Sequence, residues 1–329
     1  MPRRKRRRRP EPSEEECAIY IAIDGGGTKT EYLLLNEAFE PVDSIIGGAT
    51  NHERLPDGYD GVARAFRESI YALLARNGLT PQAVCAVAGG IAGADCIKQA
   101  QKLEQLLREA GFARAHVCND GFLPVMAECS GAAGIAYNCG TGVCCTAMDP
   151  QGKMTKIGGL DEWSDDAGGG VWLLQKLFTA VYEDVVLGRK KTSLTQAYLK
   201  ALNIRPEQIM AELDESLMTL KRDAEIQRQM IAAVFQAYEA GDEAACAICD
   251  RMIERAADYI AAAYRHSQFG GRALEIVMSG SVLLKAATPR FLDAMKAAVE
   301  LRVGQRILWL TPQRTPVYGA AAWLKKLTL

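Results

Sequence analysis

Two glycine-rich turns, each set between apolar segments, constrain the fold of this chain more than any other feature of its sequence. The first is IAIDGGGTKTEYLLL over residues 21–35, and the second is NCGTGVCC over residues 138–145. An apolar run on each side of a short polar turn predicts a β-hairpin. Two hairpins of the same design indicate that one structural plan occurs twice in the chain.

Each hairpin begins a block in which strands and helices alternate. In the first block we expect strands at 17–24, 31–36, 41–47, 83–90 and 115–118, with helices at 59–77 and 96–110. In the second block we expect strands at 133–138, 143–148, 153–158 and a final one at 274–279, with a helical region at 171–267 and a closing helix at 315–327. This order predicts two related α/β domains, each a mixed sheet covered by helices, with a ligand cleft between them.

The first turn has the composition of an anion site. Glycines at 25–27 permit positive φ angles and close backbone approach, and successive amide groups in such a turn can converge on an anion. Lys29 adds a positive charge, and Thr28 adds a hydroxyl donor. Asp24 suits a hydrated Mg²⁺ held beside phosphates. An ordinary bulged hairpin would explain the first turn alone, but the second turn repeats the arrangement.

The two turns together predict a nucleotide site that grips a polyphosphate from both sides. Neither turn matches a Walker A loop or a dinucleotide fingerprint. The ordered segments IAIDGGGTKT, CNDG, YNCGTG and MSGSVLLK resemble the actin-like, sugar-kinase and Hsp70 ATPase fold, a pair of ribonuclease H-like domains with an inter-domain ATP and substrate cleft. Within it, the chain resembles the BadF/BadG/BcrA/BcrD-type ATPases, and among them the N-acetylglucosamine kinases, over residues 18–327.

The resemblance implies a division of the chain and a set of site residues. Residues 1–16 would be a disordered tail, 17–122 with 315–329 the N-terminal ATPase domain, and 123–314 the C-terminal one. Asp120 would be the catalytic base and Asp24 would hold Mg²⁺ through water, while Asn51, Asp120 and Asp166 would bind the sugar. The ATP phosphates and adenosine would be bound by Gly26, Gly27, Thr28, Lys29, Gly140, Thr141, Gly142, Gly280 and Ser281.

Asp120 follows a short strand and would therefore face the cleft, where one carboxylate can accept the proton of an attacking hydroxyl. The alternative from the residues alone is a helix N-cap, because NDGFLPVMAEC could begin a helix. The segment GGLDEWSDDAGGG departs from the kinase pattern: Asp166 is retained, but Leu160 replaces a tryptophan and Ala167 a glutamate. Substrate preference is open at this point, and Asp161 or Glu162 could compensate.

The resemblance implies an ATP-dependent carbohydrate kinase that acts on N-acetylglucosamine, glucosamine or N-acetylmuramic acid, and it implies a homodimer. The alternative within the same family is an ATPase that activates a radical dehydratase or reductase through an iron–sulfur cluster. Its cysteine motifs are not evident among the ten scattered cysteines, which favour core packing in a reducing cytoplasm.

Charge and hydropathy exclude several other classes of protein. The RRKRRRR run at residues 3–9 favours a solvated tail over a nucleic-acid or membrane tether, and the remaining chain is acidic by about four charges. No apolar stretch approaches the roughly 18 residues of a membrane span, and no apolar segment follows the basic run as in a secretory signal. We therefore expect a cytoplasmic protein with a small-molecule sugar substrate, no nucleic-acid partner and no membrane partner.

Overall fold

The computed structural model describes residues 19–328, and the predicted tail at 1–16 lies outside these residues. The chain divides into two compact units, which are described separately here. The first ends at Ala127 and resumes at Arg314, and the second is Glu128–Gln313. The boundaries predicted from the sequence, 122/123 and 314/315, lie within a few residues of this division.

A five-stranded mixed sheet forms the centre of the first unit, in the order β3-β2-β1-β4-β5. Strand β1 is antiparallel to β2 and parallel to β4, and β4 is parallel to β5. Its elements are β1 (Ile19–Gly25), β2 (Thr30–Leu35), β3 (Pro41–Gly47), α1 (Gly58–Arg76), β4 (Val84–Ile91), α2 (Ile97–Glu109), β5 (Ala115–Cys118), α3 (Leu123–Glu128) and α10 (Val317–Thr328).

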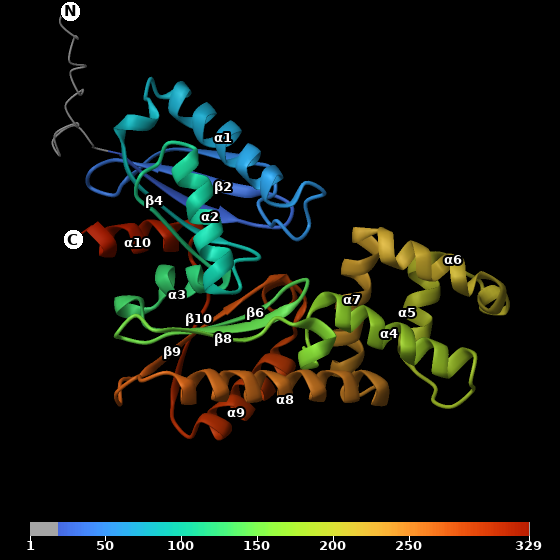
Figure 1. The fold of residues 1–329 in the computed structure, drawn as a ribbon. Coiled ribbons are helices and arrows are strands. Elements are labelled where there is room, and N and C mark those ends of the chain that lie inside the picture. Colours follow the sequence, from blue (N-terminus) through green and yellow to red (C-terminus); the bar gives the residue numbers. More distant parts are fainter. Residues whose placement is uncertain (1–18, 329) are drawn as a thin grey trace, which may run out of the picture. The chain divides into compact units, whose positions relative to one another are not determined.

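Helices cover both faces of this first sheet, which explains why β1 and β4 read as continuous apolar runs. One core joins β1, β2 and β4 to α1 and α2 through side chains such as Ile21, Phe66 and Leu103. Helix α10 lies on the opposite face from α1 and packs along β1 and β4 (Figure 1). Strand β3 is at the edge, where Val42 and Ile46 are exposed.

The second unit repeats the plan with the order β10-β9-β6-β7-β8. Strand β6 is antiparallel to β7 and parallel to β9, as β1 is to β2 and β4. The repeated plan predicted from the two hairpins is therefore confirmed. The strands of this unit are β6 (Gly134–Cys139), β7 (Val143–Met148), β8 (Met154–Gly158), β9 (Leu274–Ser279) and β10 (Ile307–Leu310).

The helices of the second unit form two groups. Helices α8 and α9 lie along one face of the sheet, and α4 to α7 pack on one another beside it (Figure 1). Their bounds are α4 (Gly170–Val185), α5 (Ser193–Leu202), α6 (Ile209–Arg222), α7 (Ala224–Glu239), α8 (Glu243–His266) and α9 (Pro289–Val303), with a π-helical turn η7 (Val282–Ala286) after β9. The sequence did not predict α3, α9 or β10, so the expectation that the strand at 274–279 is the last one is wrong.

No helix within residues 19–328 is both long enough and apolar enough to cross a bilayer.

Helix α3 is fixed in the first unit by two glycines that contact Leu123. A Cβ atom at Gly90 on β4 would overlap the Leu123 side chain, and one at Gly319 on α10 would overlap the Leu123 carbonyl oxygen. Only glycine therefore allows α10 and β4 to approach Leu123 this closely. Because Leu123 comes three residues after Asp120, this packing also positions Asp120.

We predict that Gly319→Ala lowers the free energy of unfolding by about 1–3 kcal/mol because the new methyl group meets backbone. In an ordinary helix the same substitution is stabilising, so the sign of the change is diagnostic. Gly48→Ala is the control, since no atom lies within 4 Å of its Cβ position, and it should change stability by less than about 0.5 kcal/mol. Urea unfolding checks both; a stabilised Gly319→Ala protein would contradict the packing.

Candidate active site

Polar side chains of the first unit gather where its three parallel strands end. Asp24 is the penultimate residue of β1, Asp95 follows β4, and Asn119 and Asp120 follow β5. Strands β1, β4 and β5 are neighbours, so these residues lie along one edge of the sheet. The carboxyl edge of parallel strands is where ligands of open α/β sheets bind. The structure thus brings the predicted Asp24 and Asp120 to the same edge.

Asp24 is held in an environment that disfavours its charge. Burial and, to a smaller extent, the carboxylates of Asp120 and Glu31 raise its pKa from 3.8 to about 7, and Lys29 partly opposes them. A proton or a divalent cation would relieve this repulsion, so the pair fits the predicted Mg²⁺. Among residues 19–328 no group of three or more His, Cys, Asp or Glu side chains could hold a metal ion. That Asp24 holds Mg²⁺ through water stays a prediction.

Asn119, and not Asp120, caps the short helical turn that follows β5. The Asn119 Oδ1 atom accepts the Gly121 amide at 3.0 Å, and its Nδ2 donates to Asp95 Oδ1 at 2.7 Å. The alternative that Asp120 serves as an N-cap is therefore wrong. Asn119 fixes the turn through both ends of its amide, and Asp120 is the first residue of that turn.

The first glycine turn is held by backbone bonds to two neighbouring loops. Gly26 donates to the Lys29 carbonyl and accepts from the Thr50 amide, each at 3.0 Å, and Gly25 accepts from Ala92 at 2.7 Å. The amides of Gly27, Thr28 and Lys29 form no hydrogen bond within the described part of the chain. These three donors can bind an anion.

The positive φ expected for these glycines is wrong, because none of Gly25, Gly26 and Gly27 has one. The close approach that was also expected is confirmed at Gly25 and Gly26. A Cβ atom at Gly25 would overlap the Thr50 hydroxyl, and one at Gly26 would lie 2.9 Å from the Lys29 carbonyl oxygen.

Asn51 lies in the loop that contacts this turn, and its amide nitrogen is left for a ligand. The side chain is 9% exposed, and its Oδ1 accepts the Glu53 amide at 2.9 Å. Its Nδ2 has no hydrogen-bond partner among residues 19–328. Gly93, with φ of 84°, leaves room for Asn51 and for His52, whose ring stacks on Tyr59 at 4.2 Å.

In the second unit, helix α4 holds the second glycine turn. Gly140 donates to Gly142 across the turn at 2.9 Å. The carbonyls of Gly140 and Thr141 accept the first amides of α4, from Gly170 at 2.8 Å and Val171 at 3.1 Å. These amides are therefore not free for an anion, whereas those of Thr141 and Gly142 form no bond within the described residues. The start of α4 thus holds the predicted phosphate loop in place.

A pocket of about 470 Å³ opens beside this turn, and it lies wholly within the second unit. The predicted Gly140, Thr141 and Ser281 line it together. Gly280 and Gly142 are not lining residues; Gly280 has φ of 90°, and a Cβ there would overlap the Cys139 backbone. Residues that the sequence did not single out complete the wall: Gly170, Val171, Leu174, Ala224, Gln227, Arg228, Ile231, Ala232, Val282, Lys285 and Ala286.

Asp166 binds the backbone of its own loop. Its Oδ2 accepts three successive amides, those of residues 159–161, at 2.8 Å each. Its Oδ1 accepts Ser164 Oγ at 2.8 Å and the Tyr259 hydroxyl. These five bonds occupy the acceptor sites of a carboxylate. That Asp166 also binds a sugar hydroxyl stays a prediction.

Several residues of this loop have positive φ angles, and the hydrogen bonds to Asp166 hold the loop in this conformation. Gly158, Gly159, Asp161 and Asp165 all have positive φ, and a Cβ at Gly158 would overlap the Tyr259 ring. The loop ends at Gly169, where a Cβ would lie 2.6 Å from Gly142 Cα. Asp166 therefore holds the segment that supports the second glycine turn. The adjacent glycines were a signal for positive φ, but nothing in the sequence pointed to Tyr259.

A family model for the BadF/BadG/BcrA/BcrD ATPase family matches residues 21–323. The chain belongs to this family. The actin-like arrangement of two α/β units with mixed sheets, expected from the sequence, is the fold of this chain.

The chain is also similar to curated and solved proteins. The chain is 28% identical over 231 residues to the N-acetylmuramic acid/N-acetylglucosamine kinase of Clostridium acetobutylicum. These residues are 68% of this chain and 71% of that protein. A putative N-acetylglucosamine kinase from Chromobacterium violaceum is 22% identical, with a TM-score of 0.63 over 94% of this chain and 99% of that one. A ROK hexokinase from Thermus thermophilus is 16% identical, with a TM-score of 0.59 over 94% and 100%.

Asp24→Asn tests the electrostatics of the first unit. The raised pKa means that the wild-type contribution of Asp24 to stability is present at low pH and is lost as the pH rises toward 7. Asparagine does not ionise and so avoids this loss. The unfolding free energy of the variant minus that of wild type should therefore be about 1–2 kcal/mol larger at pH 8 than at pH 5. Asp214→Asn, at an exposed carboxylate on α6, should show no such difference. Equal gains at both pH values for Asp24→Asn would contradict the assignment.

Asp166→Asn tests whether Asp166 holds this loop, and the neighbouring Asp165→Asn is the control. The amide cannot accept all five bonds, so we expect a loss of about 2–4 kcal/mol in unfolding free energy. Asp165→Asn removes surface ion pairs to Arg251 and Arg255 and should cost less than about 1 kcal/mol. Thermal unfolding checks both, and equal effects at the two positions would refute the clamp.

Proposed function

We propose that this protein is an ATP-dependent amino-sugar kinase. It transfers the γ-phosphate of ATP to a hydroxyl of N-acetylglucosamine or of a related sugar, glucosamine or N-acetylmuramic acid. Membership of an ATPase family and similarity to the Clostridium protein, which is named for its kinase activity, support this proposal. So does the presence of one glycine turn with free amides in each unit.

The observation that carries the proposal is the Asp24–Asp120 pair, together with Asn51 in the loop that contacts the first glycine turn. Burial and the charge of Asp120 raise the pKa of Asp24 to about 7, so the ionised pair is unfavourable in the free protein. Such a pair is useful where a cation and a proton acceptor are both needed. Phosphoryl transfer to a hydroxyl needs both.

In the proposed reaction the sugar hydroxyl oxygen attacks the γ-phosphorus, and the bond to the bridging oxygen of ADP breaks. The Asp120 carboxylate accepts the hydroxyl proton. The free amides of residues 27–29 and of Thr141 and Gly142 bind the β- and γ-phosphates, with Lys29 adding charge. Mg²⁺ beside Asp24 would neutralise phosphate charge.

The sugar would be oriented by the Asn51 amide nitrogen, whose oxygen is already used by the Glu53 amide. Ala167 stands where the kinase pattern has a glutamate, and it is fully buried. One sugar contact of that pattern is therefore absent from this chain. This favours a pocket with broader acceptance among amino sugars.

A panel of amino sugars with ATP and Mg²⁺, read by coupled ADP release, tests the proposal. At least one of N-acetylglucosamine, glucosamine and N-acetylmuramic acid should stimulate ADP release well above the rate without sugar. The iron content of the purified protein is measured in parallel. ADP release unaffected by every sugar, together with bound iron, would contradict the kinase and favour the activator of a radical enzyme.

We predict that Asp120→Asn lowers kcat by about 10²–10⁴ and leaves ATP binding within a few fold of wild type. Asn51→Ala should mainly raise KM for the sugar, because it removes a contact made before and during the reaction. Steady-state kinetics with nucleotide titration separates the two effects. Near-normal turnover in Asp120→Asn would remove its role as base.

A further inference from the structure

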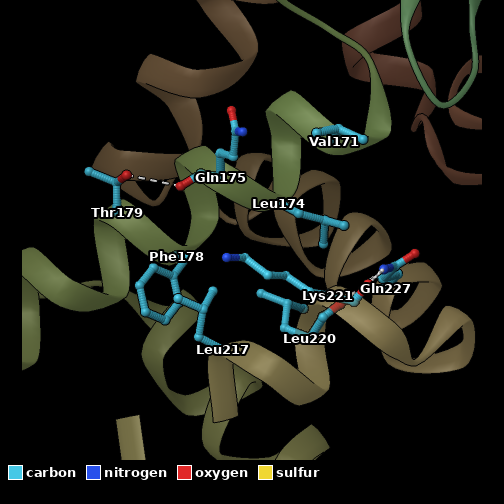
Figure 2. A pocket seen from close by; sticks show the side chains of 9 residues that line it. All are labelled: Val171, Leu174, Gln175, Phe178, Thr179, Leu217, Leu220, Lys221 and Gln227. Atoms are coloured by element: carbon cyan, nitrogen blue, oxygen red, sulfur yellow. Dashed lines mark hydrogen bonds between the residues drawn. The ribbon is translucent and has the colours of Figure 1, made fainter. Parts of the chain in front are cut away.

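Gln227, in the first turn of α7, has its side-chain amide fixed by the end of α6. Its Nε2 donates to the carbonyls of Leu220 and Lys221 at 3.0 Å each (Figure 2). These carbonyls belong to the last turn of α6, where no amide of the helix can reach them. Gln227 therefore serves as a side-chain cap for α6.

The cap determines which atom of the Gln227 amide is left for a ligand. Both hydrogens of Nε2 are used, and a flipped amide would place Oε1 against two carbonyl oxygens. The Oε1 atom must therefore face outward as an acceptor. No hydrogen bond to it forms among residues 19–328.

Gln227 stands between two pockets. It lines the 470 Å³ pocket at the second glycine turn and also a neighbouring apolar pocket of about 410 Å³ between α4 and α6. Figure 2 shows its amide oxygen directed away from Phe178 and Leu217, which line the apolar pocket. The free acceptor is thus not directed at those apolar side chains.

The distribution of side chains in the 470 Å³ pocket separates a phosphate end from a base end. Gly140 and Thr141 mark the phosphate end, while Leu174, Ile231 and Val282 could flank a planar ring. Arg228 and Lys285 are donors only. Apart from the hydroxyls of Thr141 and Ser281, Gln227 Oε1 is the one side-chain acceptor among the described lining residues.

We propose that Gln227 Oε1 accepts a hydrogen bond from the 6-amino group of adenine and so selects adenine over 6-oxo purines in the nucleotide pocket. This inference rests on the proposed use of ATP. A 6-oxo purine would place a carbonyl oxygen against Oε1, and a purine without a 6-substituent would leave Oε1 without a donor. An acceptor already fixed by the α6 cap discriminates better than one that can rotate.

Direct binding measured by titration calorimetry tests the proposal without any sugar. The ligands are ADP, purine riboside 5′-diphosphate, which lacks only the amino group, and IDP, which carries a 6-oxo group. Wild type should bind purine riboside diphosphate about 3- to 10-fold more weakly than ADP. It should bind IDP more weakly still.

The variant Gln227→Met keeps the length of the side chain and removes the acceptor. Its affinities for ADP and purine riboside diphosphate should agree within about twofold. Because Gln227→Met also removes the cap of α6, the ratio of the two affinities within one protein is compared. The control is Gln229→Met on the same helix, an exposed residue bonded to Glu225, which should keep the wild-type ratio.

Equal affinities in wild type, or a wild-type ratio in Gln227→Met, would overturn the assignment. Binding is measured without turnover, so the result is independent of the kinase proposal. Adenine selectivity that depends on Gln227, combined with no sugar-stimulated ADP release, would support this inference and contradict the proposed reaction.

Discussion

The repulsion between Asp24 and Asp120 is the constraint on which the interpretation of the first unit depends. Burial at the end of β1, together with the charge of Asp120 at the end of β5, raises the pKa of Asp24 to about 7. The sheet cannot relax the contact, because β1 and β5 both pair with β4. The packing of Leu123 against Gly90 and Gly319 fixes the turn that carries Asp120. We propose that this arrangement serves to hold a cation and to accept a proton.

The second unit has the same sheet plan, but different contacts hold its glycine turn. Its glycine turn is held by the first amides of α4 and by a loop that Asp166 and Tyr259 clamp, while the first turn is held by the loops at Thr50 and Ala92. In both units, carbonyl groups of the turn accept hydrogen bonds from neighbouring segments. Other amides of each turn form no hydrogen bond within the described residues. Each unit therefore has a glycine turn whose unbonded amides we propose to bind phosphate.

Much of this organisation could be predicted from the sequence. The strands at 115–118, 143–148 and 274–279 have the predicted bounds, because each is a short apolar run between turn residues. Strand β10 is only four residues long, and α9 begins at a proline after an irregular segment, so neither produced a clear periodic signal. The sequence identified both glycine turns but not the atoms that a side chain there would meet. Those atoms are distant in sequence, such as the Thr50 hydroxyl beside Gly25.

The roles of Asp166 and Gln227 could not be read from the sequence. Asp166 is matched by motif to a sugar ligand, yet the bonds that it makes depend on four positive φ angles and on Tyr259, which is 93 residues away. Gln227 belongs to no motif, and its free acceptor follows only from where α6 ends. Such roles depend on three-dimensional contacts.

The carboxyl ¹³C shift of Asp24, followed by NMR against pH, tests the central claim most directly. The account predicts a pKa of about 7 in the free protein, with a downward shift in the Asp120→Asn variant and on addition of Mg²⁺ and ADP. A pKa near 4 in the free protein, unchanged by the variant or by Mg²⁺ and ADP, would contradict it.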